Sequence, residues 1–381
     1  MRVMQIIDRF APLGGTERFV YDLSRQLTEG GHTVRIAACG VEDMKSWGEY
    51  DPDSVVPGRN LEDWRYAARE FAPDVILWQG GRETLNAAFH LSQSYPMATI
   101  FHSPVCPSGA RLFRDNNEIC SNTFGASCMV NWYTRKCGTN KEPWRMLQGM
   151  RLTSKMIKVA LNSRVIYTVS NSLKEILVRD GLPADKIQVI DNTLGAIFEP
   201  VAPIVPRGSG EALHILFCGR LVYYKGVQDM IQAIDVLNRQ GINIMATIVG
   251  EGWYENKLKV LVAKLGLESK IIFAGRVPGK EVDSWYDKAD AVVVPSIWPE
   301  PAGLVVPEAR RRGKSVIVYD AGGLGEWKGY LDGIQVVPRG DVEALATAMA
   351  FVRNTSSSLP REGKAERLSI VQELQNVCRH A

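Results

Sequence analysis

The sequence lacks the features that mark membrane-spanning, nucleic-acid-binding and secreted proteins. No apolar run approaches the roughly 20 residues that a membrane-spanning helix needs. Neither sign of charge dominates: 45 Lys and Arg residues stand against 42 Asp and Glu residues, for a net charge of +3, which argues against bulk nucleic-acid binding. The apolar stretch at the start of the chain is too short for a signal peptide. We therefore expect a cytoplasmic protein with no nucleic-acid partner.

Cysteine is present but not in the pattern of a secreted protein. The seven Cys residues are an odd number, which fits reduced thiols better than a framework of disulfides. The length of 381 residues exceeds what a single hydrophobic core usually supports, so two domains are expected.

Alternation of short apolar runs with amphipathic stretches predicts an α/β protein with parallel sheets. In the first half, strands are expected at 3–7, 33–38, 75–78, 99–102, 165–169 and 187–190. The pattern restarts after a proline- and glycine-rich linker, with strands expected at 213–218, 243–249, 271–274, 291–295 and 315–319. The sequence therefore predicts two doubly wound domains facing each other across a cleft.

The predicted boundaries follow from these patterns. Residues 1–200 form the first domain, 201–212 the linker and 213–355 the second domain. Residues 356–381 hold a final helix that could pack back on the first domain. Residues 104–141, with four Cys residues and no sustained periodicity, predict an irregular insertion in the first domain.

Glycines follow the first predicted strand. Gly14 and Gly15 precede a helix, where two glycines let a ligand approach the backbone and the free N–H groups favour an anion; a plain tight turn is the alternative. Neither half has the Gly-x-Gly-x-x-Gly fingerprint with an acid at the second strand, which argues against a dinucleotide-dependent oxidoreductase.

A basic pair follows the first strand of the second half. Gly219 and Arg220 end that strand, and Lys225 lies at the start of the next helix. Open α/β sheets bind ligands at the carboxyl ends of their strands, so both cations are candidates for holding phosphate; a solvated surface pair is the alternative. Gly250 and Gly275 end two further strands of the same half.

Two acidic residues flank the start of a later helix. Glu300 lies in a loop, a helix predicted over about 303–312 begins near Gly303, and Glu308 lies about one turn inside it. Carboxylates do not bind phosphate, so they suit the hydroxyl groups of a sugar. The alternative is a helix start with acids of no function.

In combination, these motifs resemble the retaining glycosyltransferases of family 4, which have the GT-B fold. The resemblance rests on Gly14-Gly15 with Glu17, on Gly219-Arg220 with Lys225-Gly226, on Gly250-Glu251-Gly252, and on Glu300-x7-Glu308. The run Gly322-Gly323-Leu324-Gly325-Glu326 is similar to a later loop of the family, and the resemblance spans about residues 1–350.

The resemblance implies a role for each matching residue. Arg220 and Lys225 would hold the nucleotide diphosphate, Glu300 would lie by the donor sugar, and Glu308 would bind the ribose hydroxyls. His102 matches a position that faces the donor sugar or the acceptor, although a lone His is as often structural. The remaining donor-binding positions would be Gly15, Gly219, Gly250, Gly275, Arg276, Val277, Gly303, Leu304 and Val305.

The implied function is transfer of a hexose from a nucleotide-diphosphate sugar, UDP- or GDP-linked, to an acceptor hydroxyl with retention. No metal is required in the family because Arg and Lys replace the divalent cation, and the acceptor would be a sugar or lipid-linked glycan in polysaccharide or glycoconjugate synthesis. The alternative is an inactive nucleotide-sugar-binding protein on the same fold. Ala302, where relatives often have an aromatic residue, and Asn192-Thr193 depart from the family pattern.

Two further segments carry hypotheses. Cys106, Cys120, Cys128 and Cys137 could form a structural zinc site, with a loop of reduced thiols or one or two disulfides as the alternatives. Residues 145–164 contain five basic and no acidic side chains among apolar ones, which is typical of an amphipathic helix on the inner face of an anionic membrane. A core helix with a basic outer face is the alternative.

Overall fold

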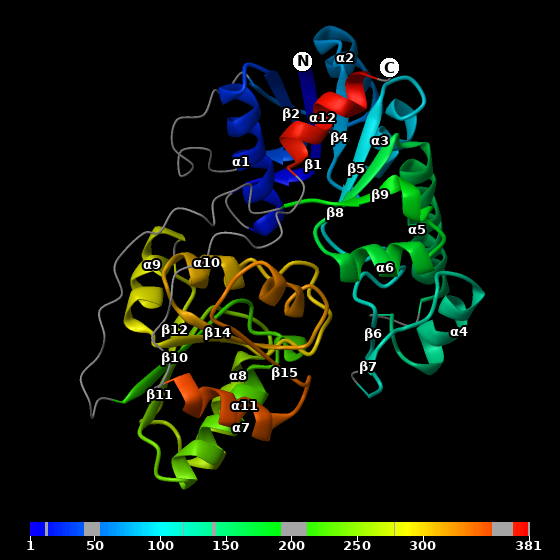
Figure 1. Cartoon of the computed structure of the whole chain (residues 1–381). Coiled ribbons are helices and arrows are strands. Elements are labelled where there is room, and N and C mark those ends of the chain that lie inside the picture. Colours follow the sequence, from blue (N-terminus) through cyan, green and yellow to red (C-terminus); the bar gives the residue numbers. More distant parts are fainter. Residues whose placement is uncertain are drawn as a thin grey trace. The chain divides into compact units, whose positions relative to one another are not determined.

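The computed structural model describes residues 1–11, 14–41, 54–116, 118–138, 142–191, 212–277, 279–352 and 369–379. The chain divides into two compact units (Figure 1). The N-terminal unit comprises Met1–Leu194 with Arg367–Ala381, and the C-terminal unit comprises Gly195–Glu366.

The N-terminal unit is an α/β sandwich. Its strands are β1 (Arg2–Phe10), β2 (Thr33–Val41), β3 (Val55–Pro57), β4 (Val75–Trp78), β5 (Met97–Phe101), β6 (Leu112–Phe113), β7 (Glu118–Ile119), β8 (Val165–Thr168) and β9 (Ile187–Val189). Its helices are α1 (Gly15–Glu29), α2 (Leu61–Phe71), α3 (Leu85–Leu91), α4 (Ala126–Thr134), α5 (Pro143–Asn162), α6 (Asn171–Arg179), η3 (Ala184–Lys186) and α12 (Ile370–Arg379).

The main sheet of this unit is parallel and has the order β3-β2-β1-β4-β5-β8-β9. The strand order reverses between β1 and β4, and crevices for ligands open at such a switch point, outside the carboxyl ends of the strands. Because helices cover both faces, the central strands are nearly continuous apolar runs: Val3, Met4 and Ile6 of β1 are fully buried. Gln5 interrupts this apolar run and is also fully buried.

The C-terminal unit repeats the architecture. Its strands are β10 (Leu213–Cys218), β11 (Ile244–Val249), β12 (Ile271–Gly275), β13 (Ala291–Val294), β14 (Ser315–Tyr319) and β15 (Ile334–Val337). Its helices are η5 (Tyr223–Lys225), α7 (Val227–Arg239), α8 (Glu255–Leu265), α9 (Gly279–Lys288), α10 (Val305–Arg311), η6 (Gly325–Gly329) and α11 (Val342–Phe351).

The sheet of the C-terminal unit is also parallel throughout, in the order β12-β11-β10-β13-β14-β15. The order reverses between β10 and β13, which places the segments after these two strands at the switch point. Two doubly wound α/β units are thus present, as the sequence predicts.

Helix α12 follows the C-terminal unit in the chain but belongs to the N-terminal unit. Ile370 and Leu374 are buried among Val3, Leu23 and Leu27 of the N-terminal core. Figure 1 shows α12 beside α1. The chain therefore returns to its first unit after completing the second.

Most predicted strands form where expected, and those at 75–78, 213–218 and 315–319 have the predicted bounds. The short strands β3 and β15 were not predicted. The helix predicted from 303 begins only at Val305, since Gly303 has a left-handed φ of 65°. The predicted linker 201–212, apart from Ala212, and Asn192-Thr193 lie outside the described residues.

The prediction that residues 104–141 hold no regular structure is wrong. Strands β6 and β7 form an antiparallel hairpin there, and α4 follows it. The pattern was hidden because the hairpin strands have two residues each and Trp132 is the buried side chain of α4.

The basic helix predicted at 145–164 is α5, which spans Pro143–Asn162. Its apolar stripe, including Met146, Met156 and Val159, is buried within the N-terminal unit, as the core-helix alternative expects. Trp144 and Leu147 at its start remain 56% and 45% exposed. Across the described ranges, no helix combines the length and the apolar character that crossing a bilayer requires.

Candidate functional site

Glycines end three neighbouring strands at the carboxyl edge of the C-terminal sheet. The Gly219 N–H donates to the Val249 carbonyl at 3.0 Å, and the Gly250 N–H donates to the Gly275 carbonyl at 2.8 Å. A Cβ atom on Gly250 would lie 1.9 Å from the Gly219 carbonyl oxygen. Gly250 therefore lets the end of β11 approach the end of β10 so closely that a side chain is excluded at this position.

Lys225 is positioned by a second close contact at the switch point. Lys225 ends η5, and Gly226 follows in the left-handed region with φ of 72°. A Cβ atom on Gly226 would lie 1.7 Å from the Pro295 carbonyl oxygen. The glycine therefore lets the start of α7 pack directly against the segment that follows β13.

Lys225 and Glu300 form the central ion pair of the site. The Lys225 Nζ donates to Glu300 Oε1 at 2.6 Å, and the Ser296 hydroxyl donates to the same oxygen at 2.8 Å. The Glu300 side chain is 8% exposed. Both contacts fall on Oε1, so Oε2 is left to accept a further hydrogen bond.

The backbone of Glu300 is fixed as well. Its carbonyl oxygen accepts from the Gly323 N–H at 2.7 Å, and Glu300 forms an isolated parallel bridge with Gly322. A Cβ atom on Gly322 would lie 2.6 Å from the Glu300 carbonyl oxygen. The glycine-rich run starting at Gly322 is therefore a clamp on the loop that carries Glu300.

Glu308 lies on the exposed side of α10. The hydroxyl of buried Tyr286 donates to Glu308 Oε2 at 3.1 Å. Burial, and then the charge of Glu308, raise the pKa of Tyr286 well above its usual value, and they raise the pKa of Cys218 to about 11. Both neighbours of Glu308 therefore remain neutral, and the carboxylate is oriented by a neutral donor.

Arg220 follows β10 at the same edge and is exposed. Among the described residues, no carboxylate forms an ion pair with its guanidinium. Arg276 instead faces Glu251 at 3.6 Å, with both side chains 62% exposed. Arg220 is thus the cation at this edge that a ligand would meet without displacing a protein carboxylate.

The remaining predicted donor positions differ in setting. Val277 is half-buried and packs against the core of the unit. Leu304 caps α10, and Val305 is its first residue. The structure brings Gly219, Gly250, Gly275, Lys225, Glu300 and Glu308 to one edge of the C-terminal sheet.

In the N-terminal unit, Gly15 is the first residue of α1 and follows Gly14, the N-cap. The Glu17 side chain folds back on this turn, since a Cβ atom on Gly14 would lie 2.7 Å from Glu17 Oε2. Burial raises the pKa of Glu17.

His102 follows β5 and is half-buried. Its Nε2 lies 2.8 Å from Gln79 Oε1, and its ring packs edge-on against Phe19 of α1 with centroids 5.1 Å apart. Burial lowers the pKa of His102 to about 4. The imidazole is therefore neutral at physiological pH and lies close to the start of α1.

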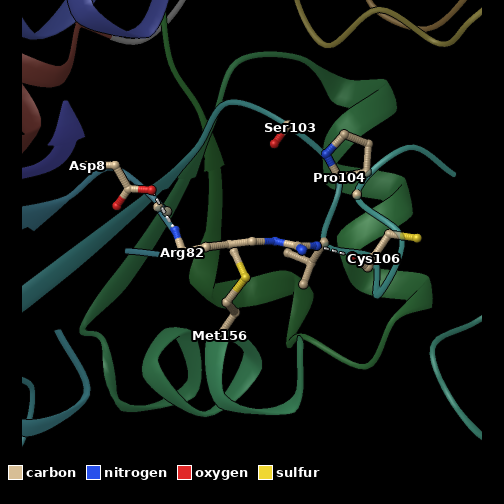
Figure 2. A pocket seen from close by; sticks show the side chains of 10 residues that line it. Asp8, Arg82, Ser103, Pro104, Cys106 and Met156 are labelled. Carbon is tan, nitrogen blue, oxygen red and sulfur yellow. Dashed lines mark hydrogen bonds between the residues drawn. The ribbon is translucent and has the colours of Figure 1, made fainter. Parts of the chain in front are cut away.

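A polar pocket of about 230 Å³ lies in the N-terminal unit, beside the carboxyl ends of β1, β4 and β5 (Figure 2). The Arg82 side chain runs across it, and its Nη2 donates to the Cys106 carbonyl at 2.7 Å. The Asp8 carboxylate accepts from the Arg82 N–H at 2.8 Å and the Thr84 N–H at 2.9 Å. Asp8 thus orders the loop after β4, while Arg82 and the exposed Ser103 present donors to the pocket.

The four clustered cysteines lie near one another as free thiols. Burial, and next the nearby thiols of the cluster, raise the pKa of Cys137 to about 11. Within the described ranges, no group of three or more His, Cys, Asp or Glu side chains is arranged to hold a metal ion. The zinc site at Cys106, Cys120, Cys128 and Cys137 gains no support from this geometry and stays a prediction.

A buried ion pair anchors the cysteine segment instead. Arg111 and Asp180 pair with side chains 4% and 1% exposed, and Asp180 also accepts from the Phe124 N–H at 3.0 Å. The segment after β5 is thereby tied to the end of α6.

Several residues of the site were not predicted. Tyr286, Gln79 and Arg82 reach partners more than 20 positions away in the sequence, and no motif marks them. Ser296 reaches Glu300 four positions along the same loop. The one available signal was Gln5, a polar residue within the apolar run of β1.

Comparisons with known proteins agree across both units. Residues 13–194 match the model of Glycosyltransferase Family 4, and residues 207–367 match Glycosyl transferases group 1. An uncharacterised glycosyltransferase of Methanocaldococcus jannaschii is 36% identical over 186 residues, which is 46% of this chain and 47% of that protein. Glycogen synthase of Mycobacterium tuberculosis is 34% identical over 189 residues, which is 49% of this chain and 45% of that protein. The matches thus span about half the length of these curated relatives.

Solved structures share the fold over the whole chain. Anabaena HepE in complex with UDP and glucose has a TM-score of 0.69 at 17% identity and covers 100% of this chain and 99% of its own. Sucrose-phosphate synthase from Thermosynechococcus elongatus has a TM-score of 0.67 at 18% identity, covering 100% and 97%. The two family models together account for most of the sequence, and the chain belongs to the family-4 glycosyltransferases with the GT-B fold.

Proposed function

We propose that the protein is a retaining glycosyltransferase that moves a hexose from a nucleotide-diphosphate sugar to an acceptor hydroxyl. The observation that carries the proposal is the ion pair between half-buried Lys225 and buried Glu300, which presents one ammonium and one open carboxylate oxygen at the switch point of the C-terminal sheet. An ammonium suits a diphosphate, and a carboxylate oxygen suits a sugar hydroxyl.

The donor would lie along the glycine-lined edge of the C-terminal unit. Arg220 and Lys225 neutralise the charge that develops on the leaving diphosphate, so these two side chains take the place of a divalent cation. Glu300 Oε2 accepts from a hydroxyl of the donor sugar, and Glu308 accepts from the ribose. UDP is the nucleotide we favour over GDP, because HepE, which shares the fold, was solved in complex with UDP and glucose.

The acceptor would be held by the N-terminal unit. The pocket beside Arg82 offers guanidinium and hydroxyl donors to an acceptor sugar or lipid-linked glycan. We place the reaction in the cytoplasm, in polysaccharide or glycoconjugate synthesis. Trp144 and Leu147 would provide the peripheral contact with a membrane if the acceptor is lipid-linked.

Calorimetry and hydrolysis assays test the proposal. The full chain is mixed with UDP-glucose, GDP-mannose or ADP-glucose in the presence of EDTA, and NMR of the released sugar reports its anomeric configuration. We expect binding of at least one donor, metal-free hydrolysis and retention. Lys225→Ala should lower kcat on the order of 100- to 1,000-fold.

The control is Lys264→Ala, which removes an exposed lysine from α8 of the same unit and should leave hydrolysis unchanged. Binding without hydrolysis or transfer would favour an inactive nucleotide-sugar-binding protein. An inverted product or a strict metal requirement would contradict the mechanism.

A further inference from the structure

A chain of buried amides leads from the core of the N-terminal unit to His102. Gln5 of β1 is fully buried and Gln79, directly after β4, is 5% exposed. Gln5 Nε2 donates to the Ser24 hydroxyl at 2.7 Å, Gln79 Nε2 donates to Gln5 Oε1 at 3.0 Å, and Gln79 Oε1 meets His102 Nε2 at 2.8 Å.

The direction of every hydrogen bond in this chain is fixed at its inner end. Gln5 Nε2 also lies 3.2 Å from the Val20 carbonyl oxygen, which can only accept. Gln5 must therefore turn its amide nitrogen toward α1 and its oxygen toward Gln79. Gln79 must then donate to Gln5, and its own oxygen is left to accept from His102.

This direction dictates the tautomer of His102. Because Gln79 Oε1 can only accept, the neutral imidazole carries its proton on Nε2 and leaves Nδ1 with a lone pair. No described residue forms a hydrogen bond with Nδ1, and the His102 side chain is only half-buried. The edge-on contact with Phe19 limits rotation of the ring that would exchange the two nitrogens.

The backbone is adapted to the contact between Gln79 and His102. Gly80 has φ of 70°, and a Cβ atom there would lie 3.1 Å from both the Ile100 carbonyl oxygen and the Phe101 ring. The glycine lets the end of β4 approach the end of β5.

We propose that Gln5 and Gln79 are positioning residues that present His102 Nδ1 as a fixed hydrogen-bond acceptor for a hydroxyl group of the bound sugar. A buried amide is tolerated in a core only when its donors and acceptor form hydrogen bonds. The hydrogen bonds of Gln5 and Gln79 lead outward to His102, whose Nδ1 is the last polar atom of the chain. An acceptor nitrogen distinguishes a hydroxyl donor from a group that can only accept. The proposal rests on the proposed function for its ligand, but the tautomer does not depend on it.

Nitrogen NMR of the full chain labelled with ¹⁵N-histidine tests the tautomer directly, with His102→Phe identifying the signal of His102. We expect the wild type at pH 7 to show a protonated Nε2 and a lone pair on Nδ1. Gln79→Met, which keeps the side-chain volume, should yield a mixture of tautomers. It should also lower kcat/KM for hydrolysis of UDP-glucose by about tenfold or more.

Thr99→Val is the matched control, because it removes from the middle of β5, the strand that His102 follows, a buried hydrogen bond of 2.8 Å to Ser163 without touching the amide chain. It should change neither the His102 signal nor the hydrolysis rate. A wild-type signal with protonated Nδ1 would overturn the proposal without any variant. An altered tautomer in Gln79→Met with unchanged kcat/KM would overturn the role of Nδ1. Failure of the wild type to hydrolyse UDP-glucose, GDP-mannose and ADP-glucose alike would contradict the proposed function, while the spectrum would still decide the tautomer.

Discussion

Single side chains at the edge of the C-terminal sheet are held by partners far away in the sequence. Lys225 and Glu300 are 75 positions apart, and each reaches the other only because β10 and β13 are neighbours. A buried carboxylate left without its cation is destabilising, whereas removing both charges is nearly neutral. Stability and ligand binding should therefore respond differently to substitutions of this pair.

We expect Lys225→Met to lower the free energy of unfolding by about 1–3 kcal/mol, since Glu300 would stay buried without its hydrogen-bonded cation. Adding Glu300→Gln should restore much of that loss. Both variants should hydrolyse nucleotide sugars far more slowly than the wild type, because both lack the Lys225 ammonium. Urea unfolding and a hydrolysis assay check the two expectations separately, and a double variant less stable than Lys225→Met would contradict the first.

Protonation of His102 should make the N-terminal unit sensitive to acid. The pKa of this group is 6.5 in an ordinary setting and about 4 in the folded protein. Between these values the unfolded chain binds more protons, so the free energy of unfolding falls as pH is lowered from 6.5 to 4, by at most about 3 kcal/mol. His102→Gln should unfold with a flatter dependence on pH. Identical pH profiles for the two proteins would argue against a buried neutral imidazole.

At the scale of elements, glycines decide how closely strand ends and helix starts approach. Gly226 and Gly241 have similar positive φ values of 72° and 76°. A Cβ atom on Gly226 would meet the Pro295 backbone, whereas none lies within 4 Å of the same atom on Gly241. The two positions therefore separate backbone strain from collision.

Gly241→Ala should lower the free energy of unfolding by about 1 kcal/mol, the strain of a left-handed alanine. Gly226→Ala should cost clearly more and should also weaken nucleotide-sugar binding, because η5 and Lys225 must move away from β13. Thermal unfolding and calorimetry of both variants measure the difference. Equal losses at the two positions would mean that the contact with Pro295 is not required.

The sequence was informative for elements and less so for contacts. Buried parallel strands read as apolar runs, which is why 75–78, 213–218 and 315–319 could be bounded correctly. The glycines after β10 and β11 could also be located from sequence, and at Gly250 the glycine replaces a side chain that the Gly219 carbonyl excludes. The contacts of Tyr286 and Gln79 could not be predicted, because each depends on how far apart in space the fold places two strands or helices. The contact of Ser296 with Glu300 depends on the conformation of an irregular loop, which periodicity does not predict.

For the whole molecule, the two units have separate cores. Leu374 of α12 is fully buried in the N-terminal core, and Leu345 of α11 is fully buried in the C-terminal core. We expect Leu374→Ala to destabilise the N-terminal unit by about 2–5 kcal/mol and Leu345→Ala to do the same to the C-terminal unit. Hydrogen exchange followed by mass spectrometry assigns each loss to its unit, and protection lost in the wrong unit would refute the assignment of α12.

The return of α12 also sets an order for folding during synthesis. The C-terminal unit is one continuous stretch, whereas the N-terminal unit is made of two stretches that lie on either side of it. A ribosome therefore releases every element of the C-terminal unit before it releases the last helix of the N-terminal one. The unit that is begun first can complete its core only last. Until α12 arrives, the surface that will receive Ile370 and Leu374 is uncovered, and a nascent chain arrested there is where we expect chaperone binding.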